Sequence, residues 1–239
     1  MNRSNLDSTL KSLQESDDNI TTLDDGWSQG RSAFGGISAA FAMTAMRKLV
    51  PNDLPLRSLS VSFIAPVPPG KVLVETEIIR KGKSVIQAEA SLVCNDNICL
   101  RAMAAFGYAR ETYEIPSNKS FKPKPRGSGV NFEDHAKQTP GFLQFFEGEW
   151  VNDGMPFAGK LSRKLELWVR HNIDLNQFPA EKLITICDIP PPVILSHFSI
   201  PPVPSSSLTW SLEFVIPPEE VSSDWFFLEF FVDAAAGGY

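Results

Sequence analysis

Asp188 is the residue whose sequence surroundings most favour chemistry. It follows the apolar residues Leu183, Ile184 and Ile186, and it precedes three consecutive prolines at positions 190–192. A carboxyl group held among apolar residues ionises less readily than in water, so its pKa rises toward the range of a useful general base. The alternative is an aspartate at a helix end that hydrogen-bonds the backbone freed by the prolines. This local pattern leaves both interpretations open.

Ser207 and the pair Gly35-Gly36 are the next candidates. Ser207 precedes an apolar run, where its hydroxyl could hold a water molecule or simply belong to a turn. No histidine adjoins it in sequence, so it is not expected to act as an activated nucleophile. The glycine pair precedes a long apolar run, and N–H groups at a helix N-terminus favour developing negative charge. The same glycines would equally permit close packing of a helix.

Composition excludes several classes of protein. The 239 residues include 22 basic and 28 acidic side chains, a formal charge of −6, which argues against a nucleic-acid partner. The first 13 residues are polar, and no run approaches the roughly 18 apolar residues of a membrane span. We therefore expect a globular protein of the cytoplasm or an organelle matrix. Three cysteines without metal-ligand spacing predict reduced thiols and neither a metal nor another cofactor.

The first half of the chain reads as helices followed by strands. Leu6, Leu10 and Leu13 recur at helical spacing and predict a short helix that covers a surface. The run 37–50 is apolar on all sides and predicts a buried helix. Four strand-like runs follow, at residues 56–67, 71–80, 84–94 and 98–108. One buried helix followed by an antiparallel meander is an α+β unit.

A second unit follows a linker. Residues 114–140 are rich in proline, glycine and polar residues and read as a linker or a long surface crossing. Beyond it the pattern predicts strands at 142–150, 164–171, 208–216 and 224–232 and a helix at 180–188. The three histidines, His135, His171 and His197, are expected at the surface or at caps.

An internal repeat relates the two halves. A shift of 149 residues aligns residues 59–63 with residues 208–212, and it also aligns the proline pair 68–69 with the pair 217–218. The strand after each proline pair ends near glycine. The first copy then continues through two more strands, whereas the second reaches only Tyr239. If the copies are true repeats, two strands of the second sheet are missing, either because a longer parent is truncated or because another chain supplies them.

These features together resemble the double hot-dog acyl-CoA thioesterases. The resemblance rests on three segments and their order on the repeat. They are Trp27 with residues 31–36 before a helix rich in small residues, the segment 187–192 around Asp188, and the strand 207–214. It implies an α+β fold of two tandem hot-dog units, each a central helix wrapped by an antiparallel sheet, forming an intramolecular pseudo-dimer. The expected divisions are 1–113 for the first unit, 114–140 for the linker and 141–239 for an incomplete second unit.

The resemblance also implies a site and a reaction. In that family an Asp, a Ser or Thr and a Gln orient the water that hydrolyses a thioester between the two units. Asp188 matches the Asp and Ser207 the hydroxyl residue, while the Gln belongs to a strand beyond Tyr239. Thr209 stands where many members have an acidic residue, and Trp210 where they have His.

The implied activity is hydrolysis of fatty acyl-CoA to free acid and CoA, a reaction of lipid metabolism that requires no metal. Phe34, Gly35, Gly36 and Thr209 are the expected substrate-binding residues, with the N–H groups near Gly36 as oxyanion donors. Phe34 could instead only fill the core. The competing hypothesis is a non-catalytic acyl-CoA-binding or scaffold protein that keeps the fold. Acyl-CoA is the expected partner, and association with further copies of the chain stays open.

Overall fold

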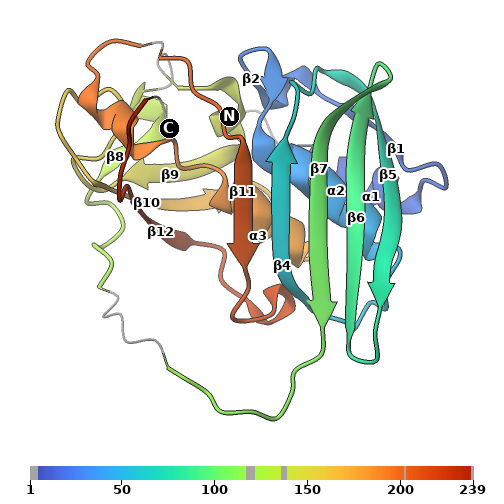
Figure 1. The fold of residues 1–239 in the computed structure, drawn as a ribbon. Helices are drawn as coiled ribbons and strands as arrows, with labels where there is room; N and C mark the ends of the chain where they lie inside the picture. Colours follow the sequence, from blue (N-terminus) through green and yellow to red (C-terminus); the bar gives the residue numbers. More distant parts are fainter. Residues whose placement is uncertain (1–4, 117–121, 136–138, 202, 238–239) are drawn as a thin grey trace.

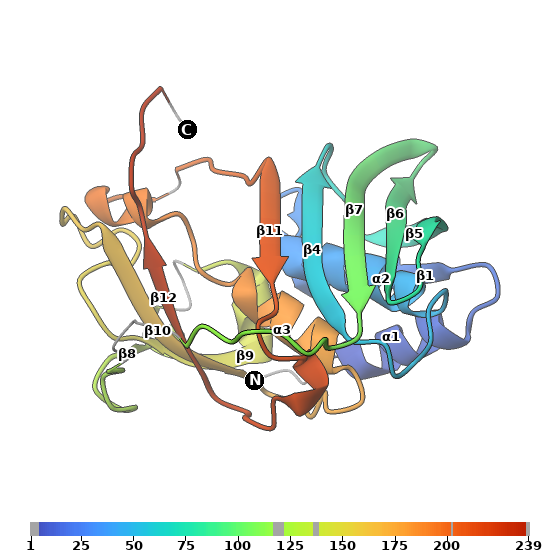
Figure 2. The same cartoon turned by 60° about the horizontal axis from the view of Figure 1, so that its bottom comes forward.

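Two helices at the centre of the molecule, each covered by an antiparallel sheet, define the fold (Figures 1 and 2). A computed structural model describes residues 5–116, 122–135, 139–201 and 203–237. The central helices are α2 (Gly35–Arg47) and α3 (Pro179–Cys187), and they pack against each other. The N-terminus of α2 meets the C-terminal half of α3 at Thr185. The helices are therefore antiparallel.

Helix α2 forms as predicted, because almost all its side chains are apolar or small and nearly all are buried. Helix α1 (Leu6–Glu15) also matches its prediction, but its role differs. Leu6, Leu10 and Leu13 are fully buried and α1 packs against α2, so this helix completes the core rather than merely covering a surface.

The first sheet has six antiparallel strands in the order β1-β5-β6-β7-β4-β11. Their bounds are β1 (Ile20–Leu23), β4 (Leu56–Phe63), β5 (Gly70–Lys81), β6 (Val85–Cys94), β7 (Asn97–Gly107) and β11 (Thr209–Glu213). The predicted strands are confirmed with small shifts at their ends. Asn95 and Asp96 both have positive φ, at 48° and 62°, and make the tight turn of the β6–β7 hairpin.

The second sheet has the order β12-β10-β9-β8. Its strands are β8 (Val130–Asn131), β9 (Phe146–Trp150), β10 (Lys164–His171) and β12 (Phe226–Phe231). A small ribbon, β2 (Ser28–Gln29) with β3 (Ser32–Ala33), lies outside both sheets. The prediction of one strand over 142–150 is partly wrong, because Gly141–Phe145 forms a 3-10 helix. That turn buries Phe142 and Phe145 together, which an extended strand of alternating faces would not do.

The pairing of β4 with β11 gives the internal repeat its structural meaning. Val61 lies opposite Trp210, the residue 149 positions further along the chain. Leu59 lies opposite Leu212, and the N–H of Phe63 donates to the carbonyl of Leu208. Equivalent segments therefore pair with each other around a local two-fold axis, as in a symmetric dimer interface. The two related units expected from the repeat, and the tandem hot-dog architecture implied by the resemblance, are confirmed.

Candidate active site

Asp188 lies where the two central helices meet. It caps the C-terminus of α3, and its carboxylate accepts a hydrogen bond from the backbone N–H of Gly36 at the N-terminus of α2. Burial raises the pKa of Asp188 from 3.8 to about 7, and the hydrogen bond from Gly36 opposes this rise without cancelling it. The carboxylate therefore binds the other helix rather than the backbone around the prolines. Its protonation changes near neutral pH.

Glycine is required at positions 35 and 36, because neighbouring atoms lie too close to leave room for a side chain. A Cβ atom at Gly35 would lie 2.8 Å from the Asp188 Oδ2 and 2.9 Å from the ring of Phe63. A Cβ atom at Gly36 would lie 3.0 Å from the Cα of Thr185 on α3 and 2.7 Å from the ring of Phe34. Gly36 thus serves helix packing, one of the two interpretations left open by the sequence, and its N–H donates to Asp188.

Phe63 lies between the site and the strand that follows Ser207. The sequence did not single out Phe63 for the site. The ring of Phe63 lies against Gly35, and its backbone N–H donates to the carbonyl of Leu208 at 2.9 Å. Ser207 directly precedes Leu208, and its side chain is exposed. Among the described residues the Ser207 hydroxyl has no hydrogen-bond partner, so no hydrogen bond links it to Asp188. Its role stays a prediction.

Thr209 occupies a different face of the sheet. Trp210 and Leu212 pack toward the core, whereas the alternate residues Thr209, Ser211 and Glu213 are exposed on the outer face. The helices cover the inner face (Figure 2), and Asp188 caps the C-terminus of one of them, α3. The structure therefore does not bring the Thr209 side chain to Asp188.

Phe34 belongs to a buried aromatic cluster at the junction of the two units. Its ring is 1% exposed, stacks on Phe142 at a centroid distance of 4.0 Å and meets Phe146 edge-on at 6.2 Å. Trp27 contacts Phe145 and Phe146 in the same cluster. Phe34 therefore packs as a core residue that fixes the start of α2 beside Asp188.

His171 was expected at the surface or at a cap, and the structure buries it instead. The residue ends β10 and is 7% exposed. Its Nε2 atom and the Thr185 hydroxyl lie 2.8 Å apart, while that hydroxyl also lies within hydrogen-bond distance of two carbonyls of α3. Burial lowers the pKa of His171 to about 3, so the ring is neutral near pH 7. It therefore anchors α3 to the second sheet without contributing a proton donor to the site.

Glu181 is a buried carboxyl group that the sequence did not reveal, at the opposite end of the helix pair. The Thr44 hydroxyl donates to the Glu181 Oε1 at 2.8 Å, and both residues are buried. Burial raises the pKa of Glu181. Local pattern could not separate it from an ordinary first-turn acidic residue, because its burial depends on the packing of α2 against α3.

Two open cavities lie away from Asp188 in the described part of the chain. The larger has a volume of about 590 Å³ and is lined by the residues after β10 and the start of α3, and the smaller, of about 300 Å³, lies near Glu181. Asp188 lines neither. The Asp188 site is a contact of two helix ends beside the ring of Phe63, and its chemistry is that of a carboxylate beside a helix N-terminus.

Comparison with known proteins agrees with this fold. A structure of a conserved protein with a hot-dog fold from Alicyclobacillus acidocaldarius superposes with a TM-score of 0.70 and 20% identity, over 84% of this chain and 74% of that chain. The TesB protein of Mycobacterium avium subsp. paratuberculosis gives 0.69 and 16%, over 97% and 88%. An acyl-CoA thioesterase II, TesB2, from Mycobacterium marinum gives 0.66 and 17%, over 96% and 86%. At these identities the likeness shows the fold alone.

Sequence comparison at the level of families is more specific. No curated protein matches the chain. No helix among the described residues combines the length and the hydropathy needed to cross a membrane. The model of the acyl-CoA thioesterase N-terminal domain matches residues 23–107, and that of the acyl-CoA thioesterase C-terminal domain matches residues 123–239. The chain belongs to the acyl-CoA thioesterase family.

Proposed function

We propose that the protein hydrolyses fatty acyl-CoA to free acid and CoA, with Asp188 as the general base. The observation that carries this proposal is a carboxyl group with a pKa of about 7, held by the N–H of Gly36 at the positive end of α2. A base whose pKa lies near the working pH is well suited to proton transfer. Membership of the acyl-CoA thioesterase family supports the choice of substrate class.

The proposed reaction requires one water molecule and no metal. The ionised Asp188 accepts a proton from the water, and the oxygen of that water attacks the thioester carbonyl. This gives a tetrahedral oxyanion. The oxyanion collapses, the C–S bond breaks, and the proton passes from Asp188 to the sulfur of CoA. The products are a fatty acid and free CoA thiol, so atoms and charge balance. Ser207 would hold the attacking water from the strand side.

The N-terminus of α2 has two tasks in this proposal. The Gly36 N–H fixes the carboxylate of Asp188, so it is not also a free donor to the oxyanion. The field of the 13-residue helix still favours negative charge beside Gly35. Phe34 would form the apolar wall behind these glycines. Thr209 faces the outer side of the sheet, away from the two helices. If its side chain contacts the substrate, it contacts a part that lies outside the space between the helices.

A non-catalytic acyl-CoA-binding or scaffold protein is the second candidate. It is favoured by the exposure of Ser207 and by the lack of a Ser207–Asp188 hydrogen bond among the described residues. Both candidates are compatible with a cytoplasmic protein of lipid metabolism. They differ in whether the thioester bond is broken.

Release of free thiol from medium-chain and long-chain acyl-CoA separates the two candidates. The variant Asp188→Asn keeps the size of the side chain and an oxygen that can accept from Gly36, but it removes the base. Asp153→Asn is the matched control, because Asp153 is an exposed aspartate paired with Lys160. We expect turnover by the parent chain and the control and a loss of turnover in Asp188→Asn. Binding of acyl-CoA without turnover by the parent chain would favour the scaffold.

A further inference from the structure

A second buried carboxyl group lines a cavity at the end of the helix pair opposite Asp188. The local two-fold axis that relates β4 to β11 also relates the central helices α2 and α3, which are antiparallel. The contact at Asp188 therefore has a counterpart where α3 begins beside the C-terminal half of α2. Glu181 of α3 and Arg47 of α2 lie there, and both line the cavity of about 300 Å³, which we call the Glu181 cavity. A cavity of this size can hold a small ligand.

Arg47 is fixed in position as a binding group for a carboxylate. Its Nη1 atom donates to the carbonyl of Leu54 at 2.7 Å, and its guanidinium lies 4.8 Å from the centre of the Phe106 ring. Its Nη2 atom donates to the Oε1 of Glu219 at 3.2 Å. The Glu219 side chain is 40% exposed, whereas that of Arg47 is 16% exposed. A carboxylate at the mouth of the cavity thus already binds Arg47, and a ligand carboxylate can take its place.

Glu181 supplies a second group for the same ligand. Its side chain is buried, and burial raises its pKa, although hydrogen bonds from its own backbone N–H and from Thr44 oppose this rise. A carboxyl group with a raised pKa keeps its proton to higher pH and can donate a hydrogen bond. The Oε1 of Glu181 accepts from the Thr44 hydroxyl at 2.8 Å, so the proton belongs on Oε2. Neutral Glu181 and charged Arg47 therefore both offer donors in one cavity.

The remaining lining of the Glu181 cavity is partly apolar and partly polar. Residues 178–180, a phenylalanine, a proline and an alanine, contribute apolar surface. The side chains of Gln14, Asn52 and Gln177 contribute exposed amide groups. Together with the donors of Arg47 and Glu181, this lining fits a carboxylate on a short apolar chain.

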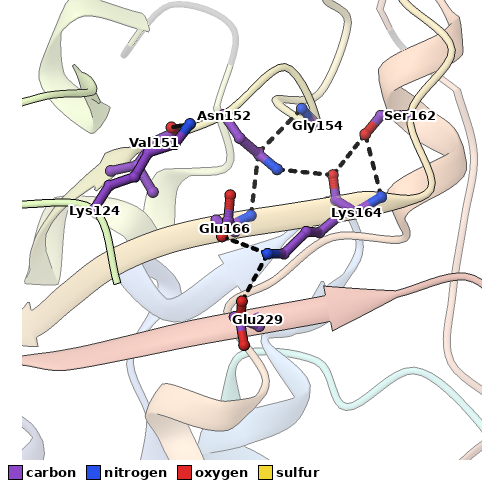
Figure 3. A network of polar contacts seen from close by, with 8 residues as sticks. All are labelled: Lys124, Val151, Asn152, Gly154, Ser162, Lys164, Glu166 and Glu229. Atoms are coloured by element: carbon purple, nitrogen blue, oxygen red, sulfur yellow. Dashed lines mark hydrogen bonds and ion pairs between the residues drawn. The ribbon is translucent and has the colours of Figure 1, made fainter. Parts of the chain in front are cut away.

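The charged network on the second sheet differs from this arrangement. Lys164 makes ion pairs with Glu166 at 2.6 Å and with Glu229 at 2.7 Å, and Asn152 bonds the backbone on either side (Figure 3). Two carboxylates therefore compensate the charge of Lys164, and none of these four residues lines either cavity. That network stabilises the sheet, whereas Arg47 has one exposed carboxylate partner and lines an open space.

We propose that the Glu181 cavity binds a short-chain carboxylate, whose carboxylate group is held by Arg47 and Glu181. The ligand replaces Glu219 as the partner of Arg47, and its chain occupies the apolar part of the cavity. The proposal rests on the contacts and lining of the cavity, and it is independent of the proposed catalysis at Asp188.

Isothermal titration calorimetry of the full chain with butyrate tests the proposal. We expect one butyrate to bind per chain. Butyramide has nearly the same size and shape but no charge, so it should not bind measurably at the same concentrations. Inorganic phosphate, an anion without an apolar chain, should bind more weakly than butyrate. Butyrate is not a thioester, so its binding does not depend on whether the protein hydrolyses acyl-CoA.

Variants of Glu219 test the competition for Arg47 without changing the core. Glu219→Gln removes the carboxylate that occupies Arg47 and should tighten butyrate binding about three- to fivefold, the effect of an exposed ion pair. Glu220→Gln is the matched control, because Glu220 is an exposed neighbour that does not line the cavity. It changes the net charge equally and should bind butyrate like the parent chain.

Variants of the two binding residues test their roles. Arg47→Lys keeps the charge but loses the planar fork of donors, and it should weaken butyrate binding about tenfold. Glu181→Ala should weaken binding about tenfold by removing a donor, whereas Glu181→Gln keeps a donor and an acceptor for Thr44 and should bind like the parent chain. Circular dichroism verifies that each variant is folded.

Three results would overturn the proposal. The first is a parent chain that does not bind butyrate. The second is binding of butyramide or phosphate as tight as that of butyrate, which would show a site without specificity for a short-chain carboxylate. The third is butyrate binding that is the same in Glu219→Gln and Glu220→Gln and unchanged in Arg47→Lys and Glu181→Ala, which would place the ligand elsewhere.

Discussion

Replacing Asp188 with asparagine should make the protein more stable above neutral pH and change its stability little near pH 4. Burial raises the pKa of Asp188 to about 7 in the folded chain. In the unfolded chain the side chain is in water, where its pKa is about 3.9. Between these two values the folded state holds a proton that the unfolded state has released. Stability contributed by this group is therefore fully present below about pH 4 and is lost as the pH rises through 7.

The size of the effect follows from the two pKa values. One pKa unit corresponds to about 1.4 kcal/mol, so the full range corresponds to roughly 4 kcal/mol. The portion between pH 5 and pH 7 is then about 2 to 3 kcal/mol. The carboxylate is only partly buried, so solvent screening makes these figures upper bounds. Asparagine has no ionisable group and should lack this pH dependence.

Urea unfolding of the parent chain and Asp188→Asn at a series of pH values measures this difference. Glu181, whose pKa is also raised by burial, is present in both proteins, so its contribution cancels in the comparison. We expect the free energy of unfolding of the parent chain to fall relative to the variant as the pH rises from 5 to 8. A difference that does not vary with pH would refute a buried, neutral Asp188 in the folded chain.

Three further substitutions are compared by urea unfolding, two at the helix pair and one at an exposed ion pair. Gly36→Ala should destabilise the protein by about 1–3 kcal/mol, because its Cβ would lie 3.0 Å from the α3 backbone, whereas Gly141→Ala, with open space around it, should have little effect. Thr44→Val should cost about 1–3 kcal/mol by removing the donor to a buried glutamate, and Thr44→Ser should restore most of it. Asp153→Asn should leave the urea midpoint unchanged, because this aspartate and its lysine partner are exposed; a clear loss there would contradict our reading of this surface ion pair.

Most of the fold could be predicted because the spacing of apolar residues differs between strands and helices and can be recognised in the sequence. The four strands of the first unit, the apolar helix α2 and the 149-residue repeat depend on patterns within short segments. The pairing of the repeated segments, with Val61 opposite Trp210, was not predicted, because it joins strands that are far apart in the sequence. The segment 142–150 was harder, because its first half buries aromatic residues on a 3-10 turn rather than on a strand.

The site was predicted less completely, because it depends on contacts between distant segments. The position of Asp188 at the end of α3 could be predicted, but its bond to Gly36 joins residues on different helices. The place of Phe63 between Gly35 and the strand after Ser207 left no signal in local sequence. The buried His171 resembles any strand-end histidine until β10 packs against α3. These features were not predicted for a common reason: the burial arises only when segments distant in the sequence pack together.

The measurement that tests the central claim most directly is the pH dependence of thioester cleavage, followed as release of free thiol from a long-chain acyl-CoA. With Asp188 as the base, kcat/KM of the parent chain should rise with pH to a plateau, with a midpoint near the pKa of about 7. Asp188→Asn should lose this activity, while Asp153→Asn should keep both the rate and the midpoint. Equal hydrolysis by the parent chain and Asp188→Asn across this pH range would contradict the assignment of Asp188.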